Sequence, residues 1–466
     1  MSELNRREFV QGTVGSLAAG VLATALSQPP PSAQAADATG FRIAPFRFDV
    51  TPPKGHSLCG GWIKPVEDYD DPLEAIGYVL LGSDQPIVVC AVDWTGLLNE
   101  AHLAWRTALA EAAGTTPERV AVHCVHQHNA PFACLESERL ILAQGDLPHI
   151  VELGYFEDCL KRGKEAVTKA LASPHKVTHI GTGQGKVEKV ASNRRILNEE
   201  GKLVNWRGSA SKDPVHHELP EGLIDPWLKT IAFFDGETKI VSTHFYATHP
   251  MSYYGDGRVS SDFAGLARKR RQQDEPDCTH IYFTGCSGNI AAGKYNEGTP
   301  QSRLQLTERM YAGIVASEEK LDMKPLTSIA WKMHEFLPTP RSSLNAAEIE
   351  KNIANHDNAV VNRNRPSYML TWIRRCEQKI PLRITALHLG HAVMLHLPAE
   401  SFIEYQLRAQ SLKPDNFVTT AAYGDGGPWY IPVKEAFPQG GYEVSVCLCE
   451  PNIDDQLTDA MKDVLA

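Results

Sequence analysis

Three histidines lie close together in the stretch AVHCVHQHNAP, at His123, His126 and His128. The stretch is typical of a β-strand, in which successive side chains alternate between two faces. His126 and His128 are therefore predicted to share one face and His123 to take the other. Neutral imidazole is a common metal ligand near pH 7, and two imidazoles on one strand edge can reach the same ion. The pair alone is weak evidence, because the chain contains 18 histidines.

Other chemically capable side chains follow further predicted strands. His249 comes directly after the apolar run KIVSTHFYAT, and Glu400 comes directly after HAVMLHLPA. Loops that a rigid sheet holds in place are where binding sites usually form, so these junctions are predicted to line one shared pocket. A glycine-rich loop after the last apolar run adds four more polar side chains: Tyr423, Asp425, Tyr430 and Tyr442.

The elements that must position these residues are strands and helices in alternation. Three pairs of apolar runs are separated by the short, turn-prone connections SDQP, GET and GH, which predict antiparallel hairpins. Apolar residues spaced three and four apart predict helices over 99–114, 154–173, 301–321 and 454–466. The pattern predicts a mixed α/β fold. A polar stretch at 339–367 interrupts the strands and is predicted to be a surface helix with flanking loops rather than a flap over the site.

Composition limits the classes of partner. The chain has 466 residues with a net charge of -10, which argues against a surface for nucleic acid or for an anionic membrane. A small-molecule or lipid substrate remains compatible with this charge. The ten cysteines include no C-x-x-C pair and do not predict a particular disulfide pattern.

The first 35 residues have the features of an export signal. Arg6 and Arg7 precede Phe9, a weakly apolar run and the tripeptide Ala33-Gln34-Ala35, which together predict a twin-arginine signal peptide over residues 1–35. The apolar run is too short and too polar to favour a membrane anchor. Residues 36–466 are then expected to form one large domain with no transmembrane segment, in the periplasm or outside the cell.

Six motifs occur in the order expected of one family: FDVTPP, VHQHNAP, SNRRI, YATHPMS with SSDFAG, LPAE, and WYIPVKEAFPQGGYE. Over residues 42–450 the chain resembles the catalytic domain of the neutral ceramidases. The resemblance implies a zinc-dependent amidohydrolase that cleaves an N-acyl bond, as in sphingolipid metabolism. It also implies a ceramidase-like α/β domain. Because the chain ends shortly after Tyr442, no C-terminal immunoglobulin-like domain is expected.

The resemblance also implies roles for individual residues. It implies that one Zn²⁺ ion has four ligands: His126, His249, Glu400 and Tyr430. It places His128 beside the water that the metal activates, Tyr442 at the developing oxyanion, and Arg194 in the substrate cleft. Two imidazoles, one carboxylate and one phenol leave the ion with positive charge and room for water. Such an ion promotes amide hydrolysis by activating water and polarising the carbonyl group.

One loop departs from the family pattern. Ceramidases carry S-N-x-G-D-V-S-P-N, with a serine important to activity, whereas this chain has the shorter FTGCSGNIAAG. Counting forward from Phe283 aligns that serine with Cys286, and counting back from Gly288 aligns it with Gly285. The neighbouring Ser287 is a possible substitute for it. Asp93, at another strand end, could orient a zinc-binding histidine or cap its strand.

Two other functions remain open at this point. The metal could serve an esterase, lactonase or deacetylase that acts on a polar envelope or polysaccharide substrate. The chain could also be a non-catalytic binding protein on the same scaffold, although the four retained ligands argue against this. The physiological substrate and the oligomeric state stay open.

Overall fold

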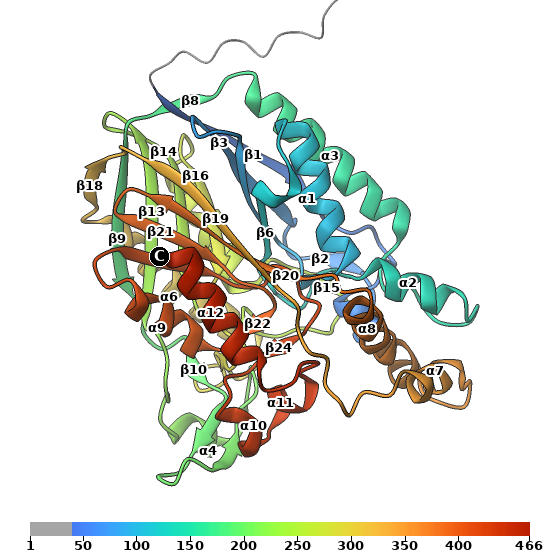
Figure 1. Cartoon of the computed structure of the whole chain (residues 1–466). Helices are drawn as coiled ribbons and strands as arrows, with labels where there is room; N and C mark the ends of the chain where they lie inside the picture. Colours follow the sequence, from blue (N-terminus) through green and yellow to red (C-terminus); the bar gives the residue numbers. More distant parts are fainter. Residues whose placement is uncertain (1–39) are drawn as a thin grey trace, which may run out of the picture. The chain divides into compact units, whose positions relative to one another are not determined.

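The computed structural model describes residues 40–466 (Figure 1). The predicted signal peptide, with Arg6 and Arg7, lies outside the described residues, so export by the twin-arginine route stays a prediction. Within residues 40–466, no helix is long and apolar enough to cross a membrane.

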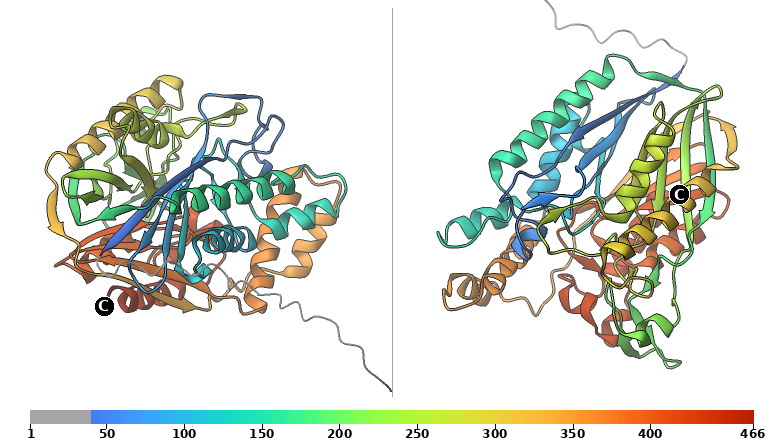
Figure 2. Two further views of the ribbon diagram at one scale, coloured as in Figure 1. Left: turned by 90° about the horizontal axis from the view of Figure 1, so that it is seen from above. Right: turned by 180° about the vertical axis from the view of Figure 1, so that it is seen from behind.

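The first large sheet has the strand order β6-β4-β3-β1-β8. The predicted hairpin with the SDQP connection forms its antiparallel pair β3 and β4, and β6 then runs parallel to β4. Two helices, α1 and α3, pack side by side and cover this sheet (Figure 2). The elements are β1 (Phe41–Asp49), β3 (Glu74–Leu81), β4 (Ile87–Val92), α1 (Glu100–Ala113), β6 (Val120–Cys124), α3 (Leu153–Leu171) and β8 (His175–Val177).

The second large sheet has the order β16-β14-β13-β9-β18. Its predicted hairpin with the GET connection is the antiparallel pair β13 and β14, and β14 pairs in parallel with β16. Helices α5 and α6 pack against each other and against its strands. The elements are β9 (His179–Lys186), β13 (Trp227–Asp235), β14 (Thr238–Tyr246), α5 (Asp262–Asp274), β16 (Thr279–Thr284), α6 (Pro300–Glu318) and β18 (Asp322–Pro325).

The third large sheet has the order β19-β20-β21-β23. The predicted hairpin with the GH connection forms β20 and β21, and β21 pairs in parallel with β23. Helix α12 packs on β19 and β20, and α9 packs on β23. The elements are β19 (Ile329–Phe336), β20 (Leu382–Leu389), β21 (Ala392–His396), α9 (Ile403–Leu412), β23 (Phe417–Ala421) and α12 (Ile453–Leu465).

Short strands at the ends of these sheets form two-stranded pairs. They are β2 (Asp68–Tyr69) with β15 (Arg258–Val259), β5 (Gly96–Leu97) with β7 (Phe132–Ala133), β10 (Ser192–Asn193) with β17 (Ile290–Ala291), β11 (Arg195–Leu197) with β12 (Leu203–Trp206), and β22 (Glu400–Ser401) with β24 (Tyr430–Ile431). The remaining helices are η1 (Cys59–Gly61), η2 (Pro117–Arg119), α2 (Leu135–Leu142), α4 (Pro214–Glu218), α7 (Ala346–Ala354), α8 (Val360–Glu377), α10 (Ala436–Gln439) and α11 (Tyr442–Val446).

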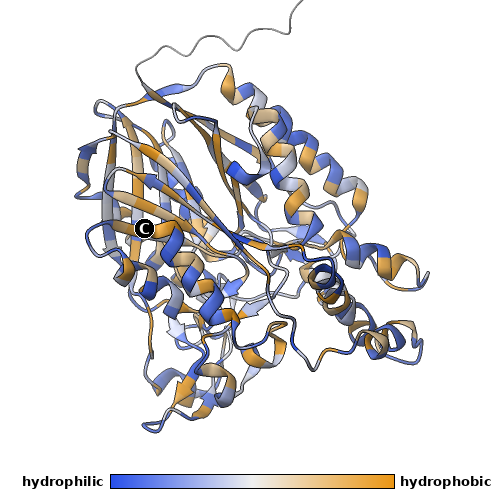
Figure 3. Ribbon diagram, in the orientation of Figure 1, coloured by the Kyte–Doolittle hydropathy of each residue, from blue (hydrophilic) through white to orange (hydrophobic). Residues whose placement is uncertain are grey.

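Two hydrophobic cores lie on opposite faces of the first sheet. In β3, Ala75 and Val79 belong to the core shared with α1 and α3, whereas Ile76, Tyr78 and Leu80 belong to the core shared with the second sheet. Because side chains alternate along a strand, these contacts bury both faces of β3, and no residue of this strand after Glu74 is charged. Figure 3 shows the same contrast between apolar strands and helices of mixed polarity. The predicted mixed α/β fold is confirmed.

Candidate metal centre

The chain leaves the strand geometry before it reaches the second of the three histidines. Strand β6 ends at Cys124, and His126 has a left-handed backbone with a φ of 73°. The prediction that strand alternation places His126 and His128 on one face is therefore wrong, because the backbone turns at His126 to donate its N–H to the carbonyl of Trp94. His123 does point elsewhere, as predicted. It is buried, with Nδ1 2.7 Å from the carbonyl oxygen of Ala422.

Two histidines and one glutamate converge despite their distance in sequence. One carboxylate oxygen of Glu400 lies 3.3 Å from Nε2 of His126 and 3.0 Å from Nε2 of His249. We call these three residues the triad. Each offers a ligand atom, and these atoms all lie within 4.8 Å of one another.

Backbone carbonyls fix which ring nitrogen of each triad histidine carries the proton. Nδ1 of His126 lies 2.6 Å from the carbonyl oxygen of Thr95, and Nδ1 of His249 lies 2.6 Å from that of Ser287. A carbonyl oxygen can only accept a hydrogen bond, so each Nδ1 is the protonated nitrogen and a neutral ring leaves a lone pair on Nε2. Both lone pairs face Glu400.

With both rings neutral this arrangement is repulsive, and a cation at the triad removes the repulsion, whether it is a metal ion or the added proton of an imidazolium. Burial acts to raise the pKa of Glu400, but the imidazoles of His126 and His249 outweigh it and hold this pKa below its usual value. Among residues 40–466, no lysine or arginine forms an ion pair with Glu400, and Nε2 of His126 has no hydrogen-bond partner. Two imidazoles and one carboxylate are a donor set of catalytic zinc sites, so the triad fits such an ion.

Tyr430 is brought to the triad by strand pairing. In the parallel pair of β22 and β24, Glu400 lies directly opposite Tyr430. The Tyr430 hydroxyl is 3.5 Å from Nε2 of His249 and accepts a hydrogen bond of 3.1 Å from Nη1 of Arg194. Burial and the charge of Glu400 raise the pKa of Tyr430 well above its usual value. The hydroxyl therefore lies beside the triad and contacts an arginine.

Arg194 connects Tyr430 to the rim of the site. Its Nε lies 3.4 Å from the buried carboxylate of Glu443, and its guanidinium carbon lies 5.3 Å from the ring centre of Tyr442. The rings of Tyr442 and Tyr430 are 5.8 Å apart, edge to face. Tyr442 is 39% exposed, which places it at the solvent side of this group.

His128 lies on the same open side. Its ring centre is 5.1 Å from that of His126 and 5.1 Å from that of Tyr254, which is 45% exposed. Its Nδ1 is 3.5 Å from the thiol of Cys59, and its Nε2 has no hydrogen-bond partner among the described residues. This ring nitrogen is a buried polar atom next to the triad whose hydrogen-bonding capacity the protein does not use.

Tyr423 and Ser287 lie at the site, although the sequence assigned no specific role to Tyr423 and gave Ser287 only as a possible substitute. The ring of Tyr423 stacks on His126 with 4.2 Å between ring centres, and its hydroxyl is 2.7 Å from that of Ser287. Ser287 therefore lies at the site, whereas Cys286 is part of a hydrophobic core and a side chain at Gly285 would collide with Gln406. The only sequence signal for Tyr423 was its place in the glycine-rich loop.

Asp93 has the strand-capping contact that was one of its two predicted roles. Its carboxylate accepts a 3.0 Å hydrogen bond from the backbone N–H of Glu74. Asp93 was also a candidate for orienting a zinc-binding histidine, but the carbonyls of Thr95 and Ser287 contact Nδ1 of the two triad histidines.

Several non-glycine residues around the triad have left-handed backbone conformations. Nine non-glycine residues of the described chain have positive φ, and five of them belong to this region: Cys59, His126, Ala399, Tyr423 and Trp429. Ala399 precedes Glu400 and Trp429 precedes Tyr430, so left-handed residues aim these two side chains. Non-glycine residues rarely adopt this conformation, and clusters of them are typical of functional sites.

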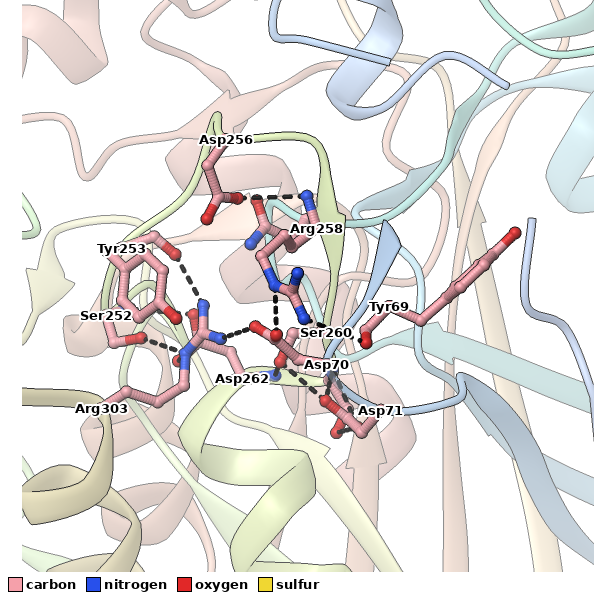
Figure 4. A network of polar contacts seen from close by, with 12 residues as sticks. Tyr69, Asp70, Asp71, Ser252, Tyr253, Asp256, Arg258, Ser260, Asp262 and Arg303 are labelled. Carbon is pink, nitrogen blue, oxygen red and sulfur yellow. Dashed lines mark hydrogen bonds and ion pairs between the residues drawn. The ribbon is translucent and has the colours of Figure 1, made fainter. Parts of the chain in front are cut away.

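A buried arginine anchors the loop that follows the second triad histidine (Figure 4). Arg303 of α6 donates to the hydroxyl of Ser252 at 2.8 Å, to the carbonyl of Tyr253 at 2.9 Å and to the carboxylate of Asp70 at 2.8 Å. These bonds hold the loop against the chain beside β2. Tyr254, which packs on His128, is the next residue in this loop.

The predicted helical segment at 339–367 reaches the site at its C-terminal end. It forms α7 and the first part of α8, where Asn364 accepts a 3.1 Å hydrogen bond from the indole N–H of Trp62. Tyr368 of α8 packs with Trp62, Phe132 and Trp429. The segment is therefore helical, as predicted, and also supports an aromatic wall next to the triad.

The space beside the triad is small. A cleft of about 20 Å³ is lined by residues that include His126, Glu400, Tyr423 and Trp429. A far larger cavity, of about 620 Å³, lies against His123 and contains no triad residue. The ligand atoms of the triad converge at the small cleft and not in the larger cavity.

Comparisons with known proteins agree with this geometry at the level of the fold. No family model and no curated protein sequence matches the chain. A solved ceramidase complexed with C2 is 13% identical, with a TM-score of 0.66 over 91% of this chain and 75% of that chain. The neutral ceramidase from Pseudomonas aeruginosa is 14% identical, with a TM-score of 0.65 over 91% of this chain and 74% of that one. The chain therefore has a ceramidase-like fold, as its sequence resemblance predicted.

Proposed function

We propose that this protein is a zinc-dependent hydrolase that cleaves an N-acyl amide bond. The observation that carries the proposal is the convergence of two imidazole lone pairs and one carboxylate oxygen in a ceramidase-like fold. His126, His249 and Glu400 would hold the ion, with the Tyr430 hydroxyl beside them. Zinc bound there would supply a Lewis acid and an activated water.

His128 is the proposed proton carrier. It is half-buried, lies next to His126, and has an unpartnered Nε2. From this place its imidazole can take a proton from the attacking water and deliver it to the nitrogen of the leaving amine. The Cys59 thiol at Nδ1 and the Tyr254 ring limit the rotation of His128.

Tyr442 and Arg194 are proposed to bind the carbonyl side of the substrate. The Tyr442 hydroxyl can donate to the oxygen that becomes negative as water attacks, and the Arg194 guanidinium adds positive charge behind that ring. Arg194 is held by Glu443 and Tyr430, so it need not reorganise during the reaction.

A second candidate function keeps the metal and changes the bond that is cleaved. The loop that departs from the ceramidase pattern brings Ser287 to Tyr423 beside the triad, and this difference favours a substrate other than ceramide. The alternative is therefore a zinc esterase, lactonase or deacetylase on a polar envelope or polysaccharide substrate. A non-catalytic binding protein is disfavoured because the proposed metal ligands, His128 and Tyr442 are all grouped in one place.

A panel of fluorogenic substrates tests the proposal. N-acyl and O-acyl substrates of matched chain length would be assayed with the zinc-loaded protein, with His128→Ala as the control. We expect N-acyl hydrolysis and a loss of about 10²- to 10⁴-fold in kcat for His128→Ala at unchanged metal content. Hydrolysis of O-acyl substrates alone would favour the esterase. Absence of hydrolysis across the panel would favour the binding protein.

A further inference from the structure

A large cavity of the described chain lies on the other side of the loop at Gly424 from the triad and has no role in the proposed mechanism. It measures about 620 Å³, within the size range of small-molecule sites, and is formed by α1, α2, the C-terminal part of α8, β6 and the neighbouring ends of β20 and β21. Gly424 lines both this cavity and the small cleft at the triad. One loop thus separates the two spaces.

One buried cation in the cavity wall has no carboxylate partner. Arg106 of α1 is 7% exposed, and its guanidinium donates to the backbone carbonyls of Pro117 and Val120. Among residues 40–466 it forms no ion pair, although each of the other four arginines of the wall does: Arg139 with Glu100, Arg374 with Glu350, Arg375 with Asp425, and Arg383 with Glu118. An uncompensated buried charge is costly, so this end of the cavity favours an anion.

The histidines of the cavity floor add no second charge. Nδ1 of His123 donates to the carbonyl of Ala422, so its Nε2 accepts from Nδ1 of His396 at 3.0 Å. Burial lowers the pKa of His123 to about 3 and that of His396 well below its usual value, so both rings are neutral. The other charged groups that face Arg106 are Arg383, Asp425 and Glu118. Arg383 pairs with Glu118, and Asp425 pairs with Arg375, so Arg106 is the cation of this wall that is left without a carboxylate.

Glu136 adds a carboxylate to the cavity wall. This residue of α2 accepts a hydrogen bond from the backbone of Glu100 and forms no ion pair among the described residues. Its charge would repel a second carboxylate. The wall also includes apolar side chains: Leu103, Val120, Val122, Leu140, Ile380 and Leu397. Leu103 remains 48% exposed at the rim.

We propose that this cavity is a second binding site, for an amphipathic monocarboxylate with its carboxylate at Arg106 and its alkyl chain along the apolar wall. The occupant would also lie against Gly424 and Asp425. The preceding residue, Tyr423, stacks on His126, so this binding site touches the loop that supports the triad. Binding itself does not depend on the proposed hydrolase activity.

Calorimetric titration with decanoate tests the site, with decylammonium as the ligand of equal chain length and opposite charge. We expect saturable binding of one decanoate and weaker binding of decylammonium. Arg106→Gln should weaken decanoate binding about tenfold, because a charge-assisted contact is lost. Equal affinity for the two ligands, or no saturable binding of decanoate, would overturn the proposal.

A second substitution, at the exposed edge of the cavity, keeps the proposal testable if Arg106→Gln does not fold. Leu103→Asp changes an exposed residue and places a negative charge at the mouth of the cavity, so it should also weaken decanoate binding. Leu142→Asp is the matched control, since Leu142 is 42% exposed at the end of α2 and does not line the cavity. Equal effects of the two aspartates would contradict this site.

Discussion

Among residues 40–466, two separate groups of two histidines and one glutamate have the spacing of a metal site. One is the triad of His126, His249 and Glu400, and the other consists of His244, His280 and Glu318. A third group, Glu275, Cys278 and His280, shares His280 with the second. The first two both combine two imidazoles with one carboxylate. They differ in what surrounds them.

The second cluster is already neutralised by the protein. Glu318 pairs with Lys239 at 2.8 Å and with Arg271 at 2.7 Å, and the two histidines share a hydrogen bond of 3.0 Å. Nε2 of His280 then contacts Glu275 at 3.1 Å. Each ring nitrogen of His244 and His280 has a hydrogen-bond partner. In the triad, by contrast, Nε2 of His126 faces the Glu400 carboxylate without a hydrogen bond. Proximity of ligand types is thus a weak criterion, and unsatisfied electron pairs without a compensating cation are the stronger one.

The largest expected difference between the clusters is in metal content. Glu400→Gln should release zinc and lower activity by on the order of a thousandfold or more, because it removes a charged ligand from a three-residue site. Glu318→Gln should leave both unchanged. Mass spectrometry of the metal after dialysis, with activity measured in parallel, checks both variants. Stoichiometric zinc in Glu400→Gln would show that the triad is not the metal site.

The second cluster should instead contribute to stability. Glu318→Ala leaves Lys239 and Arg271 with only Glu275 as a shared partner, so the free energy of unfolding should fall by about 3 kcal/mol. Glu308→Ala is the control, because Glu308 pairs with Arg270 at the exposed surface and should change stability by less than about 1 kcal/mol. Urea denaturation measures both values. Equal decreases in the free energy of unfolding for the two variants would contradict a stabilising role of the buried second cluster.

A smaller difference should appear on acidification. Burial lowers the pKa of His244 to about 3 and that of His280 to about 4, below the usual value of 6.5. As the pH falls from 6.5 towards 4, the unfolded chain gains protons that the folded chain does not, so stability decreases. Each histidine contributes a slope of about 1.4 kcal/mol per pH unit in this window.

His280→Gln should therefore reduce the pH dependence of unfolding between pH 6.5 and 4. The other charged groups that face this histidine are Glu275, Glu318, Lys239 and Arg271. Denaturant midpoints at several pH values give the slope. An unchanged slope in His280→Gln would assign the acid sensitivity to other buried groups.

Much of the fold follows from local patterns. The hairpin connections SDQP, GET and GH lie between strands that do pair in antiparallel fashion, and the predicted helix at 99–114 ends at Gly114 in a left-handed conformation. These features depend on short-range turn and helix chemistry, which the residues themselves carry. Local patterns do not reveal how three sheets stack.

The site was harder to predict from the sequence. His249, Glu400 and Tyr430 could be placed near His126 because each was predicted to follow a strand, and loops at strand ends often form one site. The preceding strands belong to three different sheets, and this stacking could not be predicted from the sequence. The turn at His126 and the stacking of Tyr423 depend on hydrogen bonds between distant segments, such as that from Cys124 to the carbonyl of Tyr423. Such contacts leave no local pattern.

The left-handed residues of the site have a consequence for the size of the domain. A non-glycine residue in this conformation is less stable by about 1–2 kcal/mol, and five of them lie in this one region. A summed strain of this kind is comparable with the whole net stability of an ordinary domain. Apolar burial must offset this backbone strain, and a first sheet that is buried on both faces contributes more of it than a sheet with one covered face.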